Sequence, residues 1–229
     1  GAPLAPMADE YLFGEYDICL NIGGIANLSV KTEDEYIAFD IGGANQVLNA
    51  IVSPLGWPFD DGGRFAEVGK LNQEMLDEVN KLNFFSKVYP KSLGNNWVVE
   101  KLIPIYNKFD GPIEDKLHTA CIQLANQVAK DIKSVLKDKL KKDTFKMLIT
   151  GGGALNEFLV KCIDLACLEI GEISVEVPDE LTIEYKEAAL MALLGVLRLE
   201  NLPTSMTSVT GARENAIGGA VHQGWKVQV

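Results

Sequence analysis

The order of the predicted strands and helices is the feature that most constrains how this chain can fold. Five segments have strand composition, namely residues 16–22, 25–31, 36–40, 146–150 and 173–177. Short glycine-containing or polar turns join the first three, which predicts antiparallel pairing. A helix follows each of the last two, which predicts parallel strands joined by right-handed crossovers. The sequence therefore predicts an α/β protein with a mixed five-stranded sheet of three antiparallel and two parallel strands.

Apolar spacing predicts six helices, at residues 45–55, 71–82, 97–106, 113–140, 156–168 and 183–200. The last of these is apolar nearly all round between Ala188 and Leu197, so we expect it to be buried. Residues 1–15, with Pro3 and Pro6, and the tail from Pro203 to Val229 are predicted mainly as loop.

Composition excludes several classes of protein. The 229 residues are 47% hydrophobic, enough for one large domain or two small ones, and the net charge of −11 offers no basic face for nucleic acid. The four cysteines have neither zinc nor disulfide spacing, which predicts core thiols in a reducing cytoplasm. Because no apolar run reaches about 18 residues, we expect no membrane span.

Two glycine-rich turns lie close together near the start of the chain. Gly23-Gly24 in NIGGIAN is explained by a hairpin turn that needs positive φ, but this does not account for Asn27 or for a second such turn after the third strand. The second turn, DIGGAN at 40–45, opens a helix whose N-terminus favours an anion. Asp40 is a candidate to hold a substrate hydroxyl or a magnesium-bound water, with helix capping as the equal alternative.

A third glycine turn follows the predicted strand 146–150. Gly151-Gly152-Gly153 lets bare backbone approach a phosphate or a planar base, and Asn156 either caps the next helix or contacts the ligand. Lys91 and Ser92 lie in a loop between helices, where lysine is a common phosphate partner but is also often merely exposed.

Taken together, the chain resembles the anhydro-N-acetylmuramic acid kinase family, whose members have the ribonuclease H-like fold of the actin and sugar-kinase superfamily. The resemblance rests on seven segments in the family's order: GAPL at 1–4, NIGGIANLS at 21–29, FDIGGAN at 39–45, FDDGGRFAEVGK at 59–70, PKSLG at 90–94, ITGGGALNEFL at 149–159 and SVTGA at 208–212. At 40–45 the family usually has Asp-Thr-Gly-Pro-Gly-Asn, so this chain differs there by losing a hydroxyl and a proline.

The resemblance implies that residues 1–229 form one C-terminal lobe of a two-lobe kinase, with a helical insertion at about 56–112. The family uses ATP and Mg²⁺ to convert 1,6-anhydro-N-acetylmuramic acid and water to N-acetylmuramic acid 6-phosphate in cell-wall recycling. The implied nucleotide-binding residues are Asn21, Gly23, Gly24, Ala26, Asn27, Gly151, Gly152, Gly153 and Asn156. The implied substrate-binding residues are Asp40, Gly42, Gly43, Asn45, Lys91 and Ser92, and Asp40 is also the candidate Mg²⁺ ligand through water.

The family's first phosphate loop and catalytic base would lie upstream of Gly1, so no catalytic residue is assigned in this chain. Phosphoryl transfer needs groups from both lobes to position the phosphate and neutralise its charge. We therefore expect the chain alone to bind nucleotide weakly and to turn over negligibly. The missing N-terminal lobe, or a homodimer, would cover an apolar patch. The alternative is a non-catalytic nucleotide-binding module, or a partner subunit of an actin-like ATPase.

Overall fold

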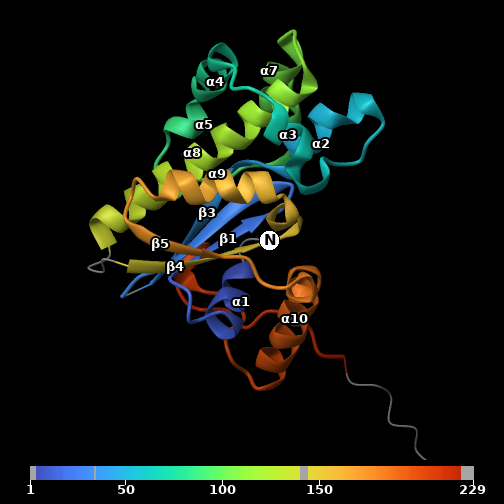
Figure 1. The fold of residues 1–229 in the computed structure, drawn as a ribbon. Coiled ribbons are helices and arrows are strands. Elements are labelled where there is room, and N and C mark those ends of the chain that lie inside the picture. Colours follow the sequence, from blue (N-terminus) through green and yellow to red (C-terminus); the bar gives the residue numbers. More distant parts are fainter. Residues whose placement is uncertain (1–3, 34, 140–143, 223–229) are drawn as a thin grey trace, which may run out of the picture.

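The computed structural model describes residues 4–33, 35–139 and 144–222. Its centre is a five-stranded sheet of order β3-β2-β1-β4-β5, formed by β1 (Ile18–Ile22), β2 (Ile25–Lys31), β3 (Tyr36–Gly43), β4 (Thr144–Thr150) and β5 (Glu172–Glu176) (Figure 1). β1, β2 and β3 pair antiparallel, whereas β4 joins β1 and β5 joins β4 in parallel. The predicted fold class is confirmed.

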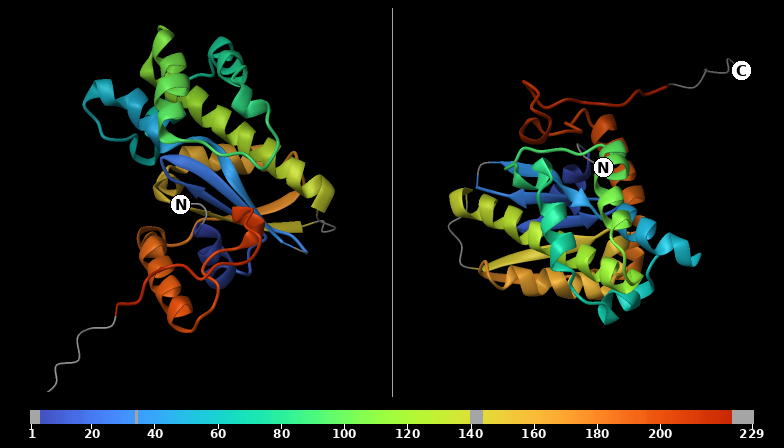
Figure 2. Two further views of the ribbon diagram at one scale, coloured as in Figure 1. Left: turned by 180° about the vertical axis from the view of Figure 1, so that it is seen from behind. Right: turned by 90° about the horizontal axis from the view of Figure 1, so that it is seen from above.

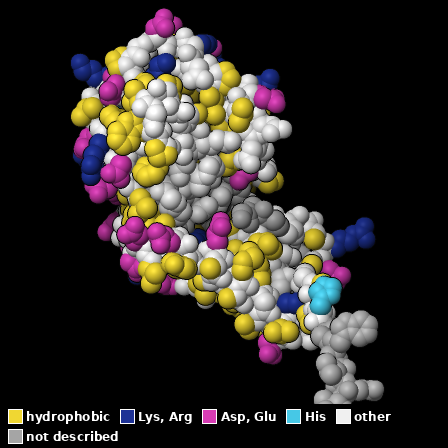
Figure 3. Space-filling model, turned by 90° about the vertical axis from the view of Figure 1, so that its right-hand side faces the viewer, with side chains coloured by type: hydrophobic (Ala, Val, Ile, Leu, Met, Phe, Trp, Pro, Cys, Tyr) yellow, Lys and Arg dark blue, Asp and Glu magenta, His cyan; other side chains and the backbone are white. Residues whose placement is uncertain are grey.

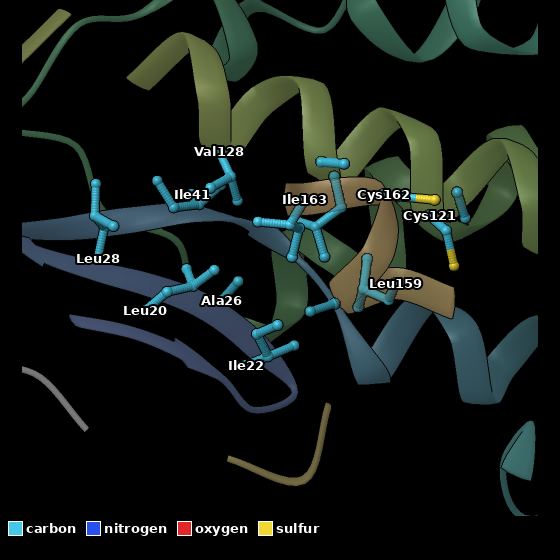
Figure 4. Packing of buried hydrophobic residues seen from close by; sticks show 14 of the residues in the cluster. Leu20, Ile22, Ala26, Leu28, Ile41, Cys121, Val128, Leu159, Cys162 and Ile163 are labelled. Carbon is cyan, nitrogen blue, oxygen red and sulfur yellow. The ribbon is translucent and has the colours of Figure 1, made fainter. Parts of the chain in front are cut away.

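Two long helices cover one face of the sheet, and they correspond to predicted helices. These are α8 (Ile113–Lys139) and α9 (Glu157–Cys167). Every second residue of β1 points into the layer between the sheet and these helices, where Ile18, Leu20 and Ile22 are fully buried. Figure 4 shows Leu20 and Ile22 lying below Val128 of α8 and Leu159 of α9. This layer is the main hydrophobic core and holds the sheet rigidly.

Short helices fill the chain between β3 and α8, and several of their apolar residues join the same core. They are α2 (Asn45–Val52), η1 (Ser53–Leu55), η2 (Asp61–Gly63), α3 (Arg64–Val68), α4 (Gln73–Asn80), α5 (Asn83–Ser86), α6 (Asn95–Trp97), η3 (Val98–Leu102) and α7 (Ile103–Lys108). The predicted helix at 97–106 is thus built from three consecutive pieces. The 3₁₀ turn η4 (Gly152–Leu155) links β4 to α9.

The opposite face of the sheet carries the N-terminal segment from residue 4 and the C-terminal segment up to residue 222 (Figures 1 and 2). The prediction of loop at residues 1–15 was wrong in part, because α1 (Ala5–Leu12) forms there with a proline in its first turn. Proline is tolerated at that position since the N–H it removes has no helical partner. α1 packs against α10 (Glu180–Leu199) through Met7, Ala8, Leu190 and Leu197.

The expectation that α10 is buried was also wrong. Only one side of the helix is covered, and Met191, Val196 and Leu199 on the other side are 55%, 58% and 68% exposed. Figure 3 shows hydrophobic side chains gathered over the lower half of the molecule, where α10 and the tail lie. A helix that is apolar all round normally has partners on every side, so this half of α10 is a candidate contact surface.

The tail folds back over α10 and the sheet. Its one helical turn is α11 (Thr207–Thr210), and the predicted loop is otherwise correct up to residue 222. Residues 223–229 lie outside the described part. None of the helices formed by the described residues is long and apolar enough to cross a membrane.

Candidate functional site

The glycine hairpin and the triple glycine meet at one end of the sheet. Asn21, near the end of β1, is the register partner of Thr150, the last residue of β4. Because the two strands are parallel, the turn after β1 and the turn after β4 leave the sheet at the same edge. Gly23-Gly24 and Gly151–Gly153 therefore lie side by side.

Two of the three glycines after β4 are required by this contact. Gly151 has φ +81°, and a Cβ atom there would lie 2.7 Å from the carbonyl oxygen of Ile22. A Cβ atom on Gly153 would overlap the side chain of Ile22. A side chain at either position would force the two turns apart, so both glycines have a purely structural explanation.

Gly23, Gly24 and Gly152 have no such explanation. None of them has positive φ, so the prediction that the hairpin glycines supply it was wrong. A Cβ atom on these residues would meet only ordinary contacts, at 3.4 Å from Ile25 O, 3.8 Å from Gln46 Cβ and 3.7 Å from Asn45 Nδ2 respectively. The fold would accept side chains there, so glycine leaves the exposed Gly24 and Gly152 and the half-buried Gly23 without side-chain cover.

The start of α2 is not an open anion site. The backbone N–H groups of Asn45 and Gln46 donate to the carbonyl oxygens of Gly23 and Gly24, at 3.1 and 3.2 Å, and Ala44 N–H donates to Gly24 at 2.9 Å. The prediction of an anion at this helix N-terminus is therefore wrong for these three N–H groups, which donate to the hairpin carbonyl oxygens instead. The Asn45 side chain adds a fourth link, from Nδ2 to Ile22 O at 3.2 Å.

A row of polar residues crosses four neighbouring strands next to the glycine turns. Thr150 pairs with Asn21, Asn21 with Asn27, and Asn27 with Asp40. Register partners have their side chains on the same face, which here is the face opposite α8 and α9. Three residues predicted from two motifs, Asn21 and Asn27 from NIGGIAN and Asp40 from DIGGAN, are thus brought together.

Asp40 is held by the loop that carries the predicted lysine. Its Oδ2 accepts hydrogen bonds from Ser92 Oγ at 2.9 Å and from Leu93 N–H at 2.7 Å. The side chain therefore caps no helix; it fixes the 90–93 loop and remains half-buried beside the polar row.

Lys91 does not point to a ligand. Its Nζ lies 2.7 Å from Oδ2 of Asp131 in α8, with only 1% of the lysine side chain exposed, and Gln127 Nε2 donates to the same oxygen at 2.9 Å. Burial lowers the pKa of Lys91 and raises the pKa of Asp131, while their mutual attraction opposes both changes. The structure gives Lys91 a structural role rather than the expected phosphate contact.

Gly42 and Gly43, expected near the substrate, are packed within the core instead. A Cβ atom on Gly43 would lie 2.8 Å from side-chain carbons of Val47 and Val98, and one on Gly42 would lie 3.2 Å from the Phe85 ring. Both residues are buried, which explains glycine at these positions without a ligand. The two glycines thus allow β3 to pass close under α2 and η3.

A cavity of about 420 Å³ opens beside the triple glycine, within the range typical of small-molecule sites. Its lining includes Asn45, Phe59, Gly152, Leu155, Asn156 and Glu180. Asn156 also caps α9 by accepting from Leu159 N–H at 2.9 Å, so its expected capping role is confirmed. Sequence reasoning missed Phe59 and Glu180; the FDDGGRF motif contained the first, but nothing near Glu180 marked it.

Asp40 is the acidic side chain of the polar row, whereas Asp60, Asp61 and Glu180 line the cavity beside Gly152. Among residues 4–33, 35–139 and 144–222, no group of three or more His, Cys, Asp or Glu side chains could hold a metal alone. Asp40 fits Mg²⁺ only in the way typical of nucleotide enzymes, in which one carboxylate, waters and phosphate oxygens share the ion.

A family model described as anhydro-N-acetylmuramic acid kinase matches residues 1–224. The chain belongs to the anhydro-N-acetylmuramic acid kinase family. The resemblance inferred from the sequence is thereby confirmed.

Several members of the anhydro-N-acetylmuramic acid kinase family match nearly the whole chain. The relative from Haemophilus influenzae is 32% identical over 96% of this chain and 61% of its own length. The relative from Francisella tularensis subsp. novicida is 33% identical over 97% of this chain and 60% of its own length. The chain therefore spans about three fifths of the relatives it matches.

A solved structure with a similar fold is the activator of the 2-hydroxyisocaproyl-CoA dehydratase from Clostridium difficile with bound ADPNP. It is 15% identical, with a TM-score of 0.45, and the match covers 86% of this chain and 67% of that one.

Proposed function

We propose that this chain is the nucleotide-binding lobe of a sugar kinase that transfers a phosphoryl group from Mg-ATP. The substrate proposed from the family is 1,6-anhydro-N-acetylmuramic acid, converted with water to N-acetylmuramic acid 6-phosphate during cytoplasmic cell-wall recycling. The observation that carries the proposal is the meeting of two glycine turns in which Gly23, Gly24 and Gly152 are not required by the fold. Bare N–H groups at such turns suit phosphate oxygens.

The 420 Å³ cavity next to Gly152 suits the adenosine part of the nucleotide. Phe59 and Leu155, which are 55% and 46% exposed, would contact the faces of the base. Glu180, at the start of α10, would accept hydrogen bonds from the ribose hydroxyls. The nucleotide would then run from this cavity, past Gly152 and Asn156, to the hairpin.

The sugar is placed on the other side of the hairpin. Asp40 and Ser92 line a second cavity, of about 410 Å³, together with Thr210 of the SVTGA segment. Mg²⁺, when bound, would neutralise phosphate charge, with Asp40 holding one of its waters. Asn21 and Asn27, in the polar row between the two cavities, would orient the phosphate oxygens by side-chain hydrogen bonds.

The domain proposal is that residues 1–229 form one lobe, with the helices at about 56–112 inserted into its ribonuclease H-like core. Roughly two fifths of the length of the Haemophilus influenzae relative lies outside the part that matches this chain. That remainder would supply the first phosphate loop and the general base. On its own, the chain would bind nucleotide weakly and hydrolyse or transfer negligible phosphate.

Nucleotide titration tests the proposal. Isothermal calorimetry and NMR with Mg-AMPPNP are expected to show weak binding, with shifted amides at Gly23, Gly24, Gly152 and Gly153. Gly152→Ala is expected to weaken binding at least tenfold, whereas Gly171→Ala, at an exposed glycine with no heavy atom within 4 Å of an added Cβ, is expected to leave it unchanged. Shifts confined to other regions, or equal effects of the two variants, would exclude this site.

The exposed side of α10 is proposed as the seat of that remaining lobe. Next to it lies a cavity of about 690 Å³, lined by Leu4, Leu194, Leu199 and Val221 among others. Adding the unmatched part of the Haemophilus influenzae relative should give a 1:1 complex by light scattering, which Met191→Glu/Val196→Glu abolishes. If the chain instead forms a homodimer that the same double variant disrupts, a second copy of the chain covers this surface and the remaining lobe does not.

Catalysis is tested with both parts present. An ADP-release assay with the anhydro sugar is expected to show no turnover by the chain alone and measurable turnover in the complex. Turnover by the chain alone, at a rate typical of sugar kinases, would show that the groups expected from the N-terminal lobe are not needed for catalysis.

A further inference from the structure

Lys186 is a buried cation in α10 that the proposed function does not use. Its Nζ donates to Oδ1 of Asp9 in α1 at 2.9 Å and to Oγ1 of Thr150 at 3.0 Å, and it lies 5.3 Å from the centre of the Phe13 ring. The side chains of Lys186 and Asp9 are 9% and 4% exposed. Three segments that are distant in the sequence therefore meet at one ammonium group.

Stabilisation alone is a weak explanation for this arrangement. Removing two charges from water costs several kcal/mol, and an apolar group of similar size often packs with no loss of stability. A buried ion pair does, however, fix the positions of both side chains. Each charge has lost its water and is stabilised only while its partner stays within hydrogen-bonding distance. The question is therefore which geometry Lys186 fixes.

Thr150 supplies the answer, because it directly precedes the glycine turn. It ends β4, and Gly151 begins the turn with its positive φ in close contact with Ile22. The turn is then closed by two hydrogen bonds, from Ala154 N–H to Gly151 O at 2.9 Å and from Asn156 N–H to Gly153 O at 3.1 Å. Anchoring the Thr150 side chain thus sets where this short closed turn starts.

We infer that Lys186 is a positioning residue that ties the Gly151–Gly153 turn to helix α1. Through Asp9, the position of α1 is coupled to the exposed residue Gly152, so nucleotide affinity depends on how α1 is docked. This inference rests on the proposed function for its consequence, but the coupling itself is a property of the free chain. Lys186 contacts no ligand in this account and acts only through Thr150.

Hydrogen exchange of the free chain, followed by NMR, tests the coupling without nucleotide. In Lys186→Met and in Thr150→Val, the amides of Ala154 and Asn156 are expected to exchange at least tenfold faster than in the unmodified chain, relative to Leu124 in α8. Lys186→Arg is expected to restore most of the protection. Lys91→Met, which removes a different buried lysine, is the matched control and is expected to affect these two amides no more than Leu124.

The milder Thr150→Val variant keeps the Lys186–Asp9 pair, so it gives a result even if Lys186→Met does not fold. Unchanged relative exchange of Ala154 and Asn156 in Thr150→Val, or an equal effect of Lys91→Met, would overturn the inference. A second readout is affinity for Mg-AMPPNP, which should fall at least fivefold in Thr150→Val and recover in Lys186→Arg relative to Lys186→Met. If the unmodified chain binds no nucleotide, the proposed function fails while the exchange data still decide the coupling.

Discussion

Asn45 and Ile22 are joined by a hydrogen bond of 3.2 Å, from the side-chain amide of the first residue of α2 to the carbonyl at the end of β1. This bond holds the helix against the glycine hairpin, and it leaves the Asn45 Oδ1 atom beside Gly153. One side chain therefore touches both glycine turns.

Asn45→Ala is expected to lower the free energy of unfolding by about 1–2 kcal/mol, because the part-buried carbonyl of Ile22 loses its partner. Asn49→Ala, at an exposed position one turn later, is the control and is expected to change stability by less than about 0.5 kcal/mol. Urea unfolding followed by circular dichroism measures both. Equal effects would mean that the Asn45 bond contributes nothing specific.

Glycines of the same turn should respond differently to alanine. Gly153→Ala is expected to destabilise the protein by about 1–3 kcal/mol, since its methyl group would overlap Ile22. Gly152→Ala is expected to be neutral or slightly stabilising, because the backbone there accepts alanine. Thermal unfolding distinguishes the two, and a large loss for Gly152→Ala would remove the argument that the fold does not need this glycine.

Lys91 and Asp131 form the other buried pair. Lys91→Met is expected to cost about 3–5 kcal/mol, since it leaves the Asp131 carboxylate buried with only Gln127 as partner. The double variant Lys91→Met/Asp131→Leu is expected to recover much of that loss. A double-mutant cycle in urea measures the coupling, and a coupling near zero would contradict the proposed ion pair.

Buried thiols predict a loss of stability at alkaline pH. Burial raises the pKa of Cys19 to about 12, of Cys162 to about 11 and of Cys167 to about 12. In the unfolded chain these thiols lose their protons near pH 9, so the stabilising contribution is complete below that pH and is lost as the pH rises toward 12. Each thiol contributes a slope of at most about 1.4 kcal/mol per pH unit in that window.

Unfolding free energies at pH 8 and pH 10.5 test this directly. We expect a decrease that is smaller in Cys19→Ala/Cys167→Ala than in the unmodified chain, and native thiols that react slowly with Ellman's reagent at pH 8. An identical decrease in the double variant would assign the alkaline loss to other groups.

Much of the sheet followed from local sequence, since strand composition and turn length decide pairing. Ile25–Lys31 was predicted with the observed bounds, and the meeting of the two glycine turns follows from parallel pairing of the strands before them. β3 runs three residues beyond its predicted end at Asp40, because Gly42 and Gly43 still pair with β2. That extension depends on the close packing of α2 against β3, which no local sequence pattern predicts.

The features that the sequence did not predict share a cause, because each depends on contacts between segments that are distant in the chain. Lys91 is buried because α8 presents Asp131 to it, forty residues later in the chain. α10 is apolar nearly all round between Ala188 and Leu197, yet α1 covers one side only, so hydrophobicity alone could not separate a core helix from a helix with an exposed contact face. Phe59 joins the candidate site because its loop leads to Gly63, which packs against Asn156 and Phe158 at the start of α9.

Phe59 and Trp57 offer the sharpest test of where the nucleotide base lies. They occupy the same loop and are 55% and 57% exposed, but only Phe59 lines the 420 Å³ cavity. Stacking of a base on an aromatic ring contributes about 1–3 kcal/mol, so Phe59→Ala is expected to weaken Mg-AMPPNP binding about five- to one-hundredfold. Trp57→Ala should leave affinity unchanged, and both variants should unfold like the parent. A loss of affinity confined to Trp57→Ala would move the base out of the cavity and onto the outer side of the loop, away from Gly152.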